Sequence, residues 1–147
     1  KVMGYIEAGH EDGAKLRAGG KRADVGGKGY FVEATVFDEV HSDMRIAQEE
    51  IFGPVLATLA FDDVDDAIDV ANRTIYGLAA GIWTRDIGKA HRAARDIQAG
   101  TVWVNTYNRY DPASPFGGFK QSGFGRDLGE IALQEYTQTK SVWVALD

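Results

Sequence analysis

Short apolar runs alternate with helix-like patterns through the middle of the chain. Val55 to Phe61 is almost continuously apolar over the length of one strand, which is typical of a strand covered on both faces. Leu78 to Thr84 and Thr101 to Asn105 repeat this pattern. Between these runs, apolar residues recur at the spacing of one helix face. The order strand, helix, strand, helix, strand predicts an α/β fold, in which right-handed crossover helices connect the strands of one parallel sheet.

Aspartates and glycines mark the ends of both predicted helices. Asp62 and Asp63 precede the first helix and Asp86 precedes the second, and aspartate both caps a helix and suits its positive N-terminal dipole. Gly77 and Gly100 follow the two helices, at positions where glycine commonly ends a helix. The predicted inward stripe of the second helix consists of Ile87, Ala90, Ala94 and Ile97.

The flanking parts of the chain are less regular. Val2 to Leu16 predicts a helix, and Tyr30 to Val36, which is rich in β-branched and aromatic residues, predicts an extended segment. Asn105 to Gly125 is rich in Gly, Pro and Asn and predicts a long loop, and Asp127 to Tyr136 predicts a short helix. Thr139 to Leu146 is apolar on both faces. It predicts a terminal strand that joins a sheet of its own chain or of a partner.

Composition narrows the classes of function. The chain has 147 residues with 16 Lys and Arg against 22 Asp and Glu, and its formal net charge of -6 argues against a nucleic-acid-binding protein. Its apolar runs are shorter than the roughly 20 residues that span a bilayer, and nothing near Lys1 resembles a signal peptide, so we expect a cytoplasmic protein without a membrane partner. The chain has no cysteine, and its three histidines lack metal-ligand spacing. We therefore expect no metal site and no cysteine nucleophile within these residues.

Two segments invite a nucleotide-binding interpretation. In the segment from Gly123 to Gly129 the third glycine falls one residue too late for the dinucleotide fingerprint, which favours a tight turn before a helix. The segment that contains Glu49 and Glu50 is different, because an aromatic residue and a Gly-Pro turn lie between these glutamates and a buried strand. A carboxylate fixed by such a turn can accept hydrogen bonds from two neighbouring hydroxyls, as on a ribose. Plain surface charge remains the alternative.

The segment EEIFGPV, which starts at Glu49, resembles the signature of the NAD(P)-dependent aldehyde dehydrogenase superfamily. Five further stretches resemble the family in the same order: GYFVEATVF, YGLAAGIWT, GTVWVN, SPFGGFKQSGFGRDLG and YTQTKSVWV. The resemblance covers nearly the whole chain. It implies that residues 1–136 are the C-terminal portion of the catalytic domain and that residues 137–147 form an oligomerisation strand, through which the protein is a homo-oligomer.

The resemblance also implies roles for individual residues. Glu50 would hold the hydroxyls of the nicotinamide ribose of NAD or NADP, with Lys1 as a further candidate for this ribose, and Phe52 would pack beside the nicotinamide. Phe116 would line the aldehyde pocket, and Asn105 would support the floor of the active site. Tyr110 is a further pocket candidate. As alternatives, the two phenylalanines are core aromatics and the asparagine caps a strand end.

By resemblance, the complete enzyme oxidises an aldehyde to a carboxylic acid. A cysteine thiolate attacks the carbonyl, the nicotinamide accepts hydride, and a glutamate base activates the water that releases the acid. In the family these groups lie upstream of the matched region, so this chain alone is expected to be inactive. Two alternatives remain open: an acylating semialdehyde dehydrogenase, which passes the acyl group to coenzyme A, and a non-catalytic assembly module.

Overall fold

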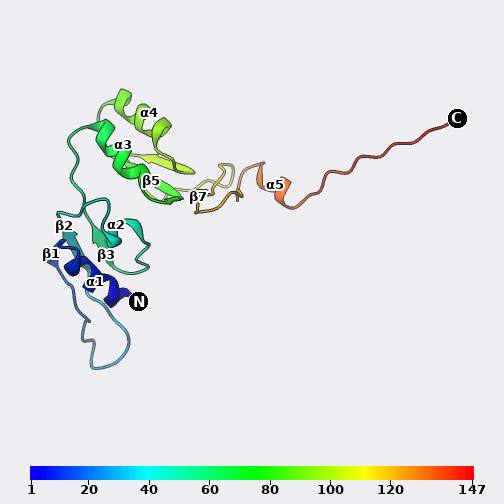
Figure 1. Ribbon diagram of the computed structural model, residues 1–147. Helices are drawn as coiled ribbons and strands as arrows, with labels where there is room; N and C mark the ends of the chain where they lie inside the picture. Colours follow the sequence, from blue (N-terminus) through cyan, green and yellow to red (C-terminus); the bar gives the residue numbers. More distant parts are fainter. The chain divides into compact units, whose positions relative to one another are not determined.

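The computed structural model describes residues 1–147 and divides them into two compact units, residues 1–74 and 75–147 (Figure 1). The first unit contains α1 (Val2–Glu11), β1 (Lys15–Ala18), β2 (Thr35–Asp38), α2 (Arg45–Gln48), β3 (Val55–Ala57) and α3 (Val64–Asn72). The second contains β4 (Tyr76–Gly77), β5 (Ala79–Ile82), α4 (Ile87–Asp96), β6 (Thr101–Val104), β7 (Phe119–Lys120) and α5 (Ala132–Glu135). The structure contains no helix that could span a membrane.

The first unit is built on a three-stranded sheet of order β1-β2-β3. Strand β1 pairs antiparallel with β2, and β3 pairs parallel with β2, so that Thr35 lies opposite Val55. Phe37 of β2 is completely buried in the core of this unit. A Cβ atom added to Gly9 of α1 would lie 3.0 Å from the Phe37 ring, so the glycine lets the helix approach the sheet closely. The other buried members of this core are Tyr5, Ile6, Ala14, Val40 and Ile46.

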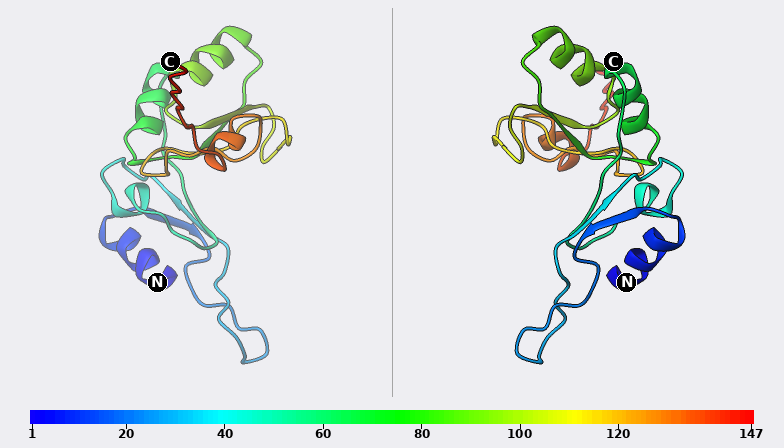
Figure 2. Two further views of the ribbon diagram at one scale, coloured as in Figure 1. Left: turned by 90° about the vertical axis from the view of Figure 1, so that its right-hand side faces the viewer. Right: turned by 90° about the vertical axis from the view of Figure 1, so that its left-hand side faces the viewer.

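Between β1 and β2 the chain projects from the sheet as a long hairpin (Figure 2). One antiparallel bridge, from Arg22 to Val32, closes it part of the way along. Beyond this bridge, Gly26, Gly27 and Gly29 have positive φ angles, which glycine adopts without steric cost. The first residues of the predicted extended segment, 30–34, therefore belong to the hairpin. The regular strand β2 begins only at Thr35, later than predicted.

In the second unit, β5 and β6 form a parallel pair that α4 connects and covers. This confirms the predicted α/β class and one strand-helix-strand repeat. The predicted single sheet is wrong, because β3 pairs with β2 while β5 pairs only with β6. An apolar run predicts a strand, but it does not identify the neighbouring strand. The predicted cover on both faces is also absent from this chain, because Leu56 of β3 is 57% exposed. A further antiparallel pair joins β4 to β7, and β7 lies inside the segment predicted as a loop.

The predicted helix starts are confirmed by cap geometry. The Asp63 carboxylate accepts hydrogen bonds from two backbone N–H groups in the first turn of α3, at 2.8 and 3.0 Å. Asp86 caps α4 in the same way, at 2.8 and 3.1 Å. The inward stripe of α4 needs correction, because Ala90 and Ala93 are buried whereas Ile87 is exposed. The short alanine side chains let the helix pack closely on the two strands, so the buried face of α4 is the one that carries these alanines.

Two helix ends also differ from the predictions. Helix α1 ends at Glu11, and Gly13, with φ of 89°, turns the chain into β1. Residues 127–131 do not join α5, because Asp127 is bridged to Phe116 and Leu128 has a φ of 62°, outside the helical region.

The structure assigns no strand to residues 139–146. These residues pair with no strand of the chain, so the terminal strand stays a prediction.

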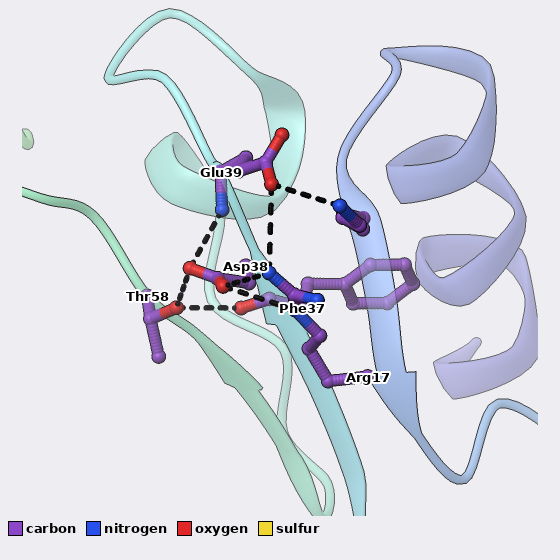
Figure 3. Close-up of polar contacts among 6 residues, drawn as sticks. Arg17, Phe37, Asp38, Glu39 and Thr58 are labelled. Carbon is purple, nitrogen blue, oxygen red and sulfur yellow. Dashed lines mark hydrogen bonds and ion pairs between the residues drawn. The ribbon is translucent and has the colours of Figure 1, made fainter.

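A polar cluster ties β1 to β2 (Figure 3). Arg17 donates two hydrogen bonds to Asp38, from Nε at 3.0 Å and from Nη2 at 2.8 Å. The backbone N–H of Glu39 and the hydroxyl of Thr58 donate to the other oxygen of Asp38, at 2.8 and 3.0 Å. These bonds, led by the backbone bond and followed by those from Arg17 and Thr58, lower the pKa of the Asp38 carboxyl.

We expect Asp38→Asn to destabilise the first unit at neutral pH and to have less effect in acid. The pKa of Asp38 is lower in the folded state, so its contribution is present above about pH 4 and is lost as the pH falls through the folded pKa. Urea unfolding of wild type and variant at about pH 7 and about pH 3 measures the difference. Asp69→Asn, on the exposed side of α3, is the control for loss of charge alone. Equal effects of both variants at neutral pH would contradict the expectation.

Candidate functional site

The segment that follows α2 is anchored by Glu49. Its carboxylate accepts a hydrogen bond from the hydroxyl of Tyr5 at 2.8 Å and another from Nε of Arg45 at 3.0 Å. The Arg45 guanidinium also lies over the Tyr5 ring, 5.0 Å from its centroid. Arg45 and then Tyr5 lower the pKa of the Glu49 carboxyl, which is therefore ionised at neutral pH. This glutamate links α1, α2 and the following segment.

Glu50 differs from Glu49 in its partners rather than in its exposure. The backbone at Glu49 is extended, with φ of -104° and ψ of 144°, and consecutive side chains of an extended chain point to opposite sides. The Glu50 side chain is exposed and makes no hydrogen bond or ion pair within the chain. Both of its carboxylate oxygens are thus available to accept hydrogen bonds from a ligand such as a vicinal diol.

A tight turn holds the residues after Glu50. The N–H of Gly53 donates to the carbonyl of Ile51 at 2.8 Å, and the carbonyl of Pro54 accepts from Thr35 of β2 at 2.8 Å. A Cβ atom on Gly53 would lie 2.7 Å from the Val2 side chain, so the turn lies directly against α1. Phe52 at this turn is 82% exposed. It is therefore not a core aromatic in this unit, and its ring is available for contact with a flat ligand.

Lys1 lies near the same segment. It is exposed beside the start of α1, and its positive charge makes a small contribution to the lowered pKa of Glu49. The first unit thus brings three of the residues predicted for the cofactor into one region: Lys1, Glu50 and Phe52.

The second unit contains an aromatic cluster at the end of β6. The rings of Trp103 and Tyr110 meet edge to face at 5.6 Å between centroids, and Tyr110 meets Phe116 in the same way at 5.1 Å. The indole N–H of Trp103 donates to the carbonyl of Arg109 at 2.8 Å, which fixes the loop backbone. These four residues are among those that line one pocket. The structure therefore places Phe116 and Tyr110, both predicted for the aldehyde pocket, in direct contact.

Asn105 performs a structural task in this chain. Its side-chain oxygen accepts from the N–H of Thr84 and its amide nitrogen donates to the carbonyl of Thr84, both at 2.9 Å. The residue adopts a φ of 54°, a left-handed conformation that asparagine tolerates better than most residues. This pair of bonds ties the end of β5 to the end of β6, as expected of a capped strand end. A supporting role of Asn105 at the active site stays a prediction.

Sequence reasoning did not single out Tyr5, Arg45 or Arg109. Arg45 and Glu49 are four residues apart, and this spacing is a readable sign of a helical ion pair. Tyr5 is 44 residues from Glu49, and no local pattern could join them. Arg109 stands beside Tyr110 in the glycine- and proline-rich segment, where pattern arguments give little information.

Comparison with known proteins identifies the family. The family model described as "Aldehyde dehydrogenase family" matches residues 1–142. The chain belongs to the aldehyde dehydrogenase family. Among curated relatives, the putative aldehyde dehydrogenase DhaS of Bacillus subtilis is 53% identical over 147 residues, which cover 100% of this chain and 29% of that protein. Aldehyde dehydrogenase 1A1 of Gallus gallus is 53% identical over 146 residues, covering 99% of this chain and 28% of that protein.

Solved aldehyde dehydrogenases share the fold of this family member. An indole-3-acetaldehyde dehydrogenase from P. syringae, in complex with NAD+ and IAA, matches with a TM-score of 0.93 and 56% identity over 99% of this chain. The NAD+ complex of an aldehyde dehydrogenase from Bacillus cereus matches with a TM-score of 0.92 and 53% identity. In both cases the match covers 29% of the solved chain. The chain therefore spans less than a third of the length of the relatives that it matches.

Proposed function

We propose that residues 1–147 are the C-terminal portion of the catalytic domain of an NAD(P)-dependent aldehyde dehydrogenase that oxidises an aldehyde to a carboxylic acid. The observation that carries the proposal is the contrast between two adjacent glutamates. Glu49 is held by Tyr5 and Arg45, whereas Glu50 has no partner in the chain and lies two residues from an exposed phenylalanine. The family membership and the NAD+ complexes of the solved relatives support the same assignment.

In this proposal the chain binds and orients the nicotinamide end of the cofactor. The Glu50 carboxylate accepts hydrogen bonds from the two ribose hydroxyls, which fixes the position of the sugar. The Phe52 ring packs beside the nicotinamide. The bound cofactor supplies a hydride acceptor. Because a displacement of about 1 Å can cost a hundredfold in rate, the rigid anchoring of Glu49 matters for this positioning task.

The proposal assigns two further functions to the second unit. Phe116 and Tyr110 line part of the aldehyde pocket, where their rings contact the apolar body of the substrate. Residues 137–147 form a strand by pairing with a sheet of a neighbouring subunit. Val142 and Trp143 in this segment are exposed, as a strand that pairs only after assembly requires.

We expect the purified 147-residue chain to show no aldehyde-dependent formation of NADH, because it contains no cysteine to act as the thiol nucleophile. The same chain within the complete enzyme should be active. The measurement is NADH absorbance with a panel of aldehydes, and circular dichroism verifies that each sample is folded. Turnover by the isolated chain would contradict the expectation that the catalytic thiol lies outside these 147 residues. Inactivity of a folded complete enzyme toward all aldehydes would overturn the proposed function itself.

A further inference from the structure

The lining of the aromatic pocket in the second unit includes a positively charged side chain that the proposed function does not use. Arg109 lines this pocket and is exposed, and its guanidinium makes no hydrogen bond or ion pair within the chain. The arginines of the first unit considered above behave differently, since Arg17 and Arg45 both bind carboxylates of their own chain. Arg109 is therefore available to a ligand in a way that they are not.

The backbone of Arg109 is fixed at the pocket. Its carbonyl accepts the indole hydrogen bond of Trp103, which is buried in the second unit. The residue before it, Asn108, adopts a left-handed φ of 57°, and the residue after it, Tyr110, packs against Trp103. The charged side chain is thus attached to a well-defined part of the pocket wall.

Asp111 is the acidic residue among those that line the pocket, and its side chain is engaged in a turn. One carboxylate oxygen accepts from the N–H of Ala113 at 2.8 Å, and the carbonyl of Asp111 accepts from the N–H of Ser114 at 2.9 Å. No ion pair joins Asp111 to Arg109. The Asp111 carboxylate therefore leaves the arginine unneutralised by direct contact.

We propose that Arg109 makes this pocket selective for aldehydes that carry a carboxylate at the end remote from the reacting carbonyl. The inference rests on the proposed function and deepens it by naming a substrate class. A guanidinium binds a carboxylate through two parallel hydrogen bonds, a geometry that an ammonium or a neutral group does not provide. The rings of Tyr110 and Phe116 contact the hydrocarbon chain between the two ends. A quaternary ammonium aldehyde would be attracted by the rings but repelled by Arg109.

The first test uses the complete enzyme with succinate semialdehyde and butanal, which have the same number of carbons and differ in the terminal carboxylate. Wild type should favour succinate semialdehyde. Arg109→Met should lower kcat/KM for succinate semialdehyde by about 10- to 100-fold, mainly through KM, and should change the value for butanal by less than about 2-fold. Arg109→Lys should recover part of the loss. Lys89→Gln removes a positive charge from α4, outside the pocket lining, and should leave the preference unchanged.

The outcomes separate this inference from the proposed function. If wild type oxidises both aldehydes and Arg109→Met alters them equally, the substrate class is wrong while the dehydrogenase assignment stands. If a folded complete enzyme oxidises no aldehyde, the proposed function is wrong, and the role of Arg109 is then decided by a binding measurement that needs no turnover.

This binding measurement uses the 147-residue chain itself. The indole N–H resonance of Trp103, identified by its loss in Trp103→Phe, reports on the pocket because this N–H is bonded to the Arg109 backbone. Butyrate should shift the resonance in a saturable way in wild type and not in Arg109→Met, and butylamine should have no such effect. An equal shift in both proteins, or no shift with butyrate in wild type, would overturn the proposal.

Discussion

Replacement of Gly100 by alanine is expected to destabilise the second unit by about 3 kcal/mol or more, because the new methyl group has no room. A Cβ atom on Gly100 would overlap the carbonyl oxygen of Gly117 and would lie 2.7 Å from its carbonyl carbon. Both are backbone atoms, so rotation of a side chain cannot relieve the clash. Gly100 also donates its N–H to the carbonyl of Gly77 at 3.0 Å, directly before β6, and a backbone shift there disturbs the strand as well.

The matched control is Gly4→Ala in α1. A Cβ atom on Gly4 meets no other atom within 4 Å, so alanine should stabilise the first unit by about 0.5–1 kcal/mol through its better helix propensity. Chemical unfolding followed by circular dichroism, with amide exchange to assign the loss to one unit, measures both changes. A Gly100→Ala variant as stable as wild type would mean that the segment around Gly117 does not lie against Gly100.

Replacement of Glu50 by glutamine in the complete enzyme is expected to lower kcat/KM for NAD by about 10- to 100-fold, because charge-assisted hydrogen bonds to the ribose are weakened. The stability of the first unit should not change, since Glu50 is exposed and makes no internal contact. Steady-state kinetics with NAD as the varied substrate and the urea midpoint of the same variant give the two quantities. A loss of cofactor affinity without a loss of stability is the signature of a ligand contact.

Glu49→Gln is the neighbouring comparison. This variant loses the charge that binds Arg45 and weakens the bond from Tyr5, so we expect a lower urea midpoint together with a smaller, indirect effect on NAD. Together the two variants distinguish the glutamate that contacts the ribose from the one that stabilises the fold. If Glu49→Gln abolishes NAD binding with unchanged stability while Glu50→Gln is neutral, the roles of the two glutamates are reversed and the proposed ribose contact is wrong.

The features that the sequence predicts well are those set by neighbouring residues. Asp63 and Asp86 cap their helices because a carboxylate reaches N–H groups only two and three residues ahead. The partner of β3 is different, because strand pairing depends on segments that are distant in sequence, and the apolar run from Val55 is compatible with any buried neighbour. The strand predicted at the end of the chain also depends on a distant partner, and residues 139–146 pair with none of the three sheets of this chain.

The candidate site likewise combines features set by neighbouring residues with features set by residues that are distant in sequence. Glu50 and Phe52 could be named from a motif, but that motif does not explain why one of two adjacent glutamates is free. Part of the explanation is the hydroxyl of Tyr5, which comes from α1 and binds Glu49 together with Arg45. Asn105 gives the converse case, since both polar groups of its amide are engaged by Thr84, 21 residues earlier. Only the three-dimensional structure separates the polar side chains that are free from those that are engaged.

The hairpin between β1 and β2 has a consequence for proteolysis. Its exposed Lys21, Arg22 and Lys28 make it a preferred site for a protease that cleaves after basic residues, because exposed loop tips are where nicking concentrates. A cut there would leave β1 hydrogen-bonded to β2 and α1 packed on Phe37. The nicked unit would remain assembled from two polypeptides, so the place of α1 in this unit depends on packing and pairing rather than on an unbroken backbone.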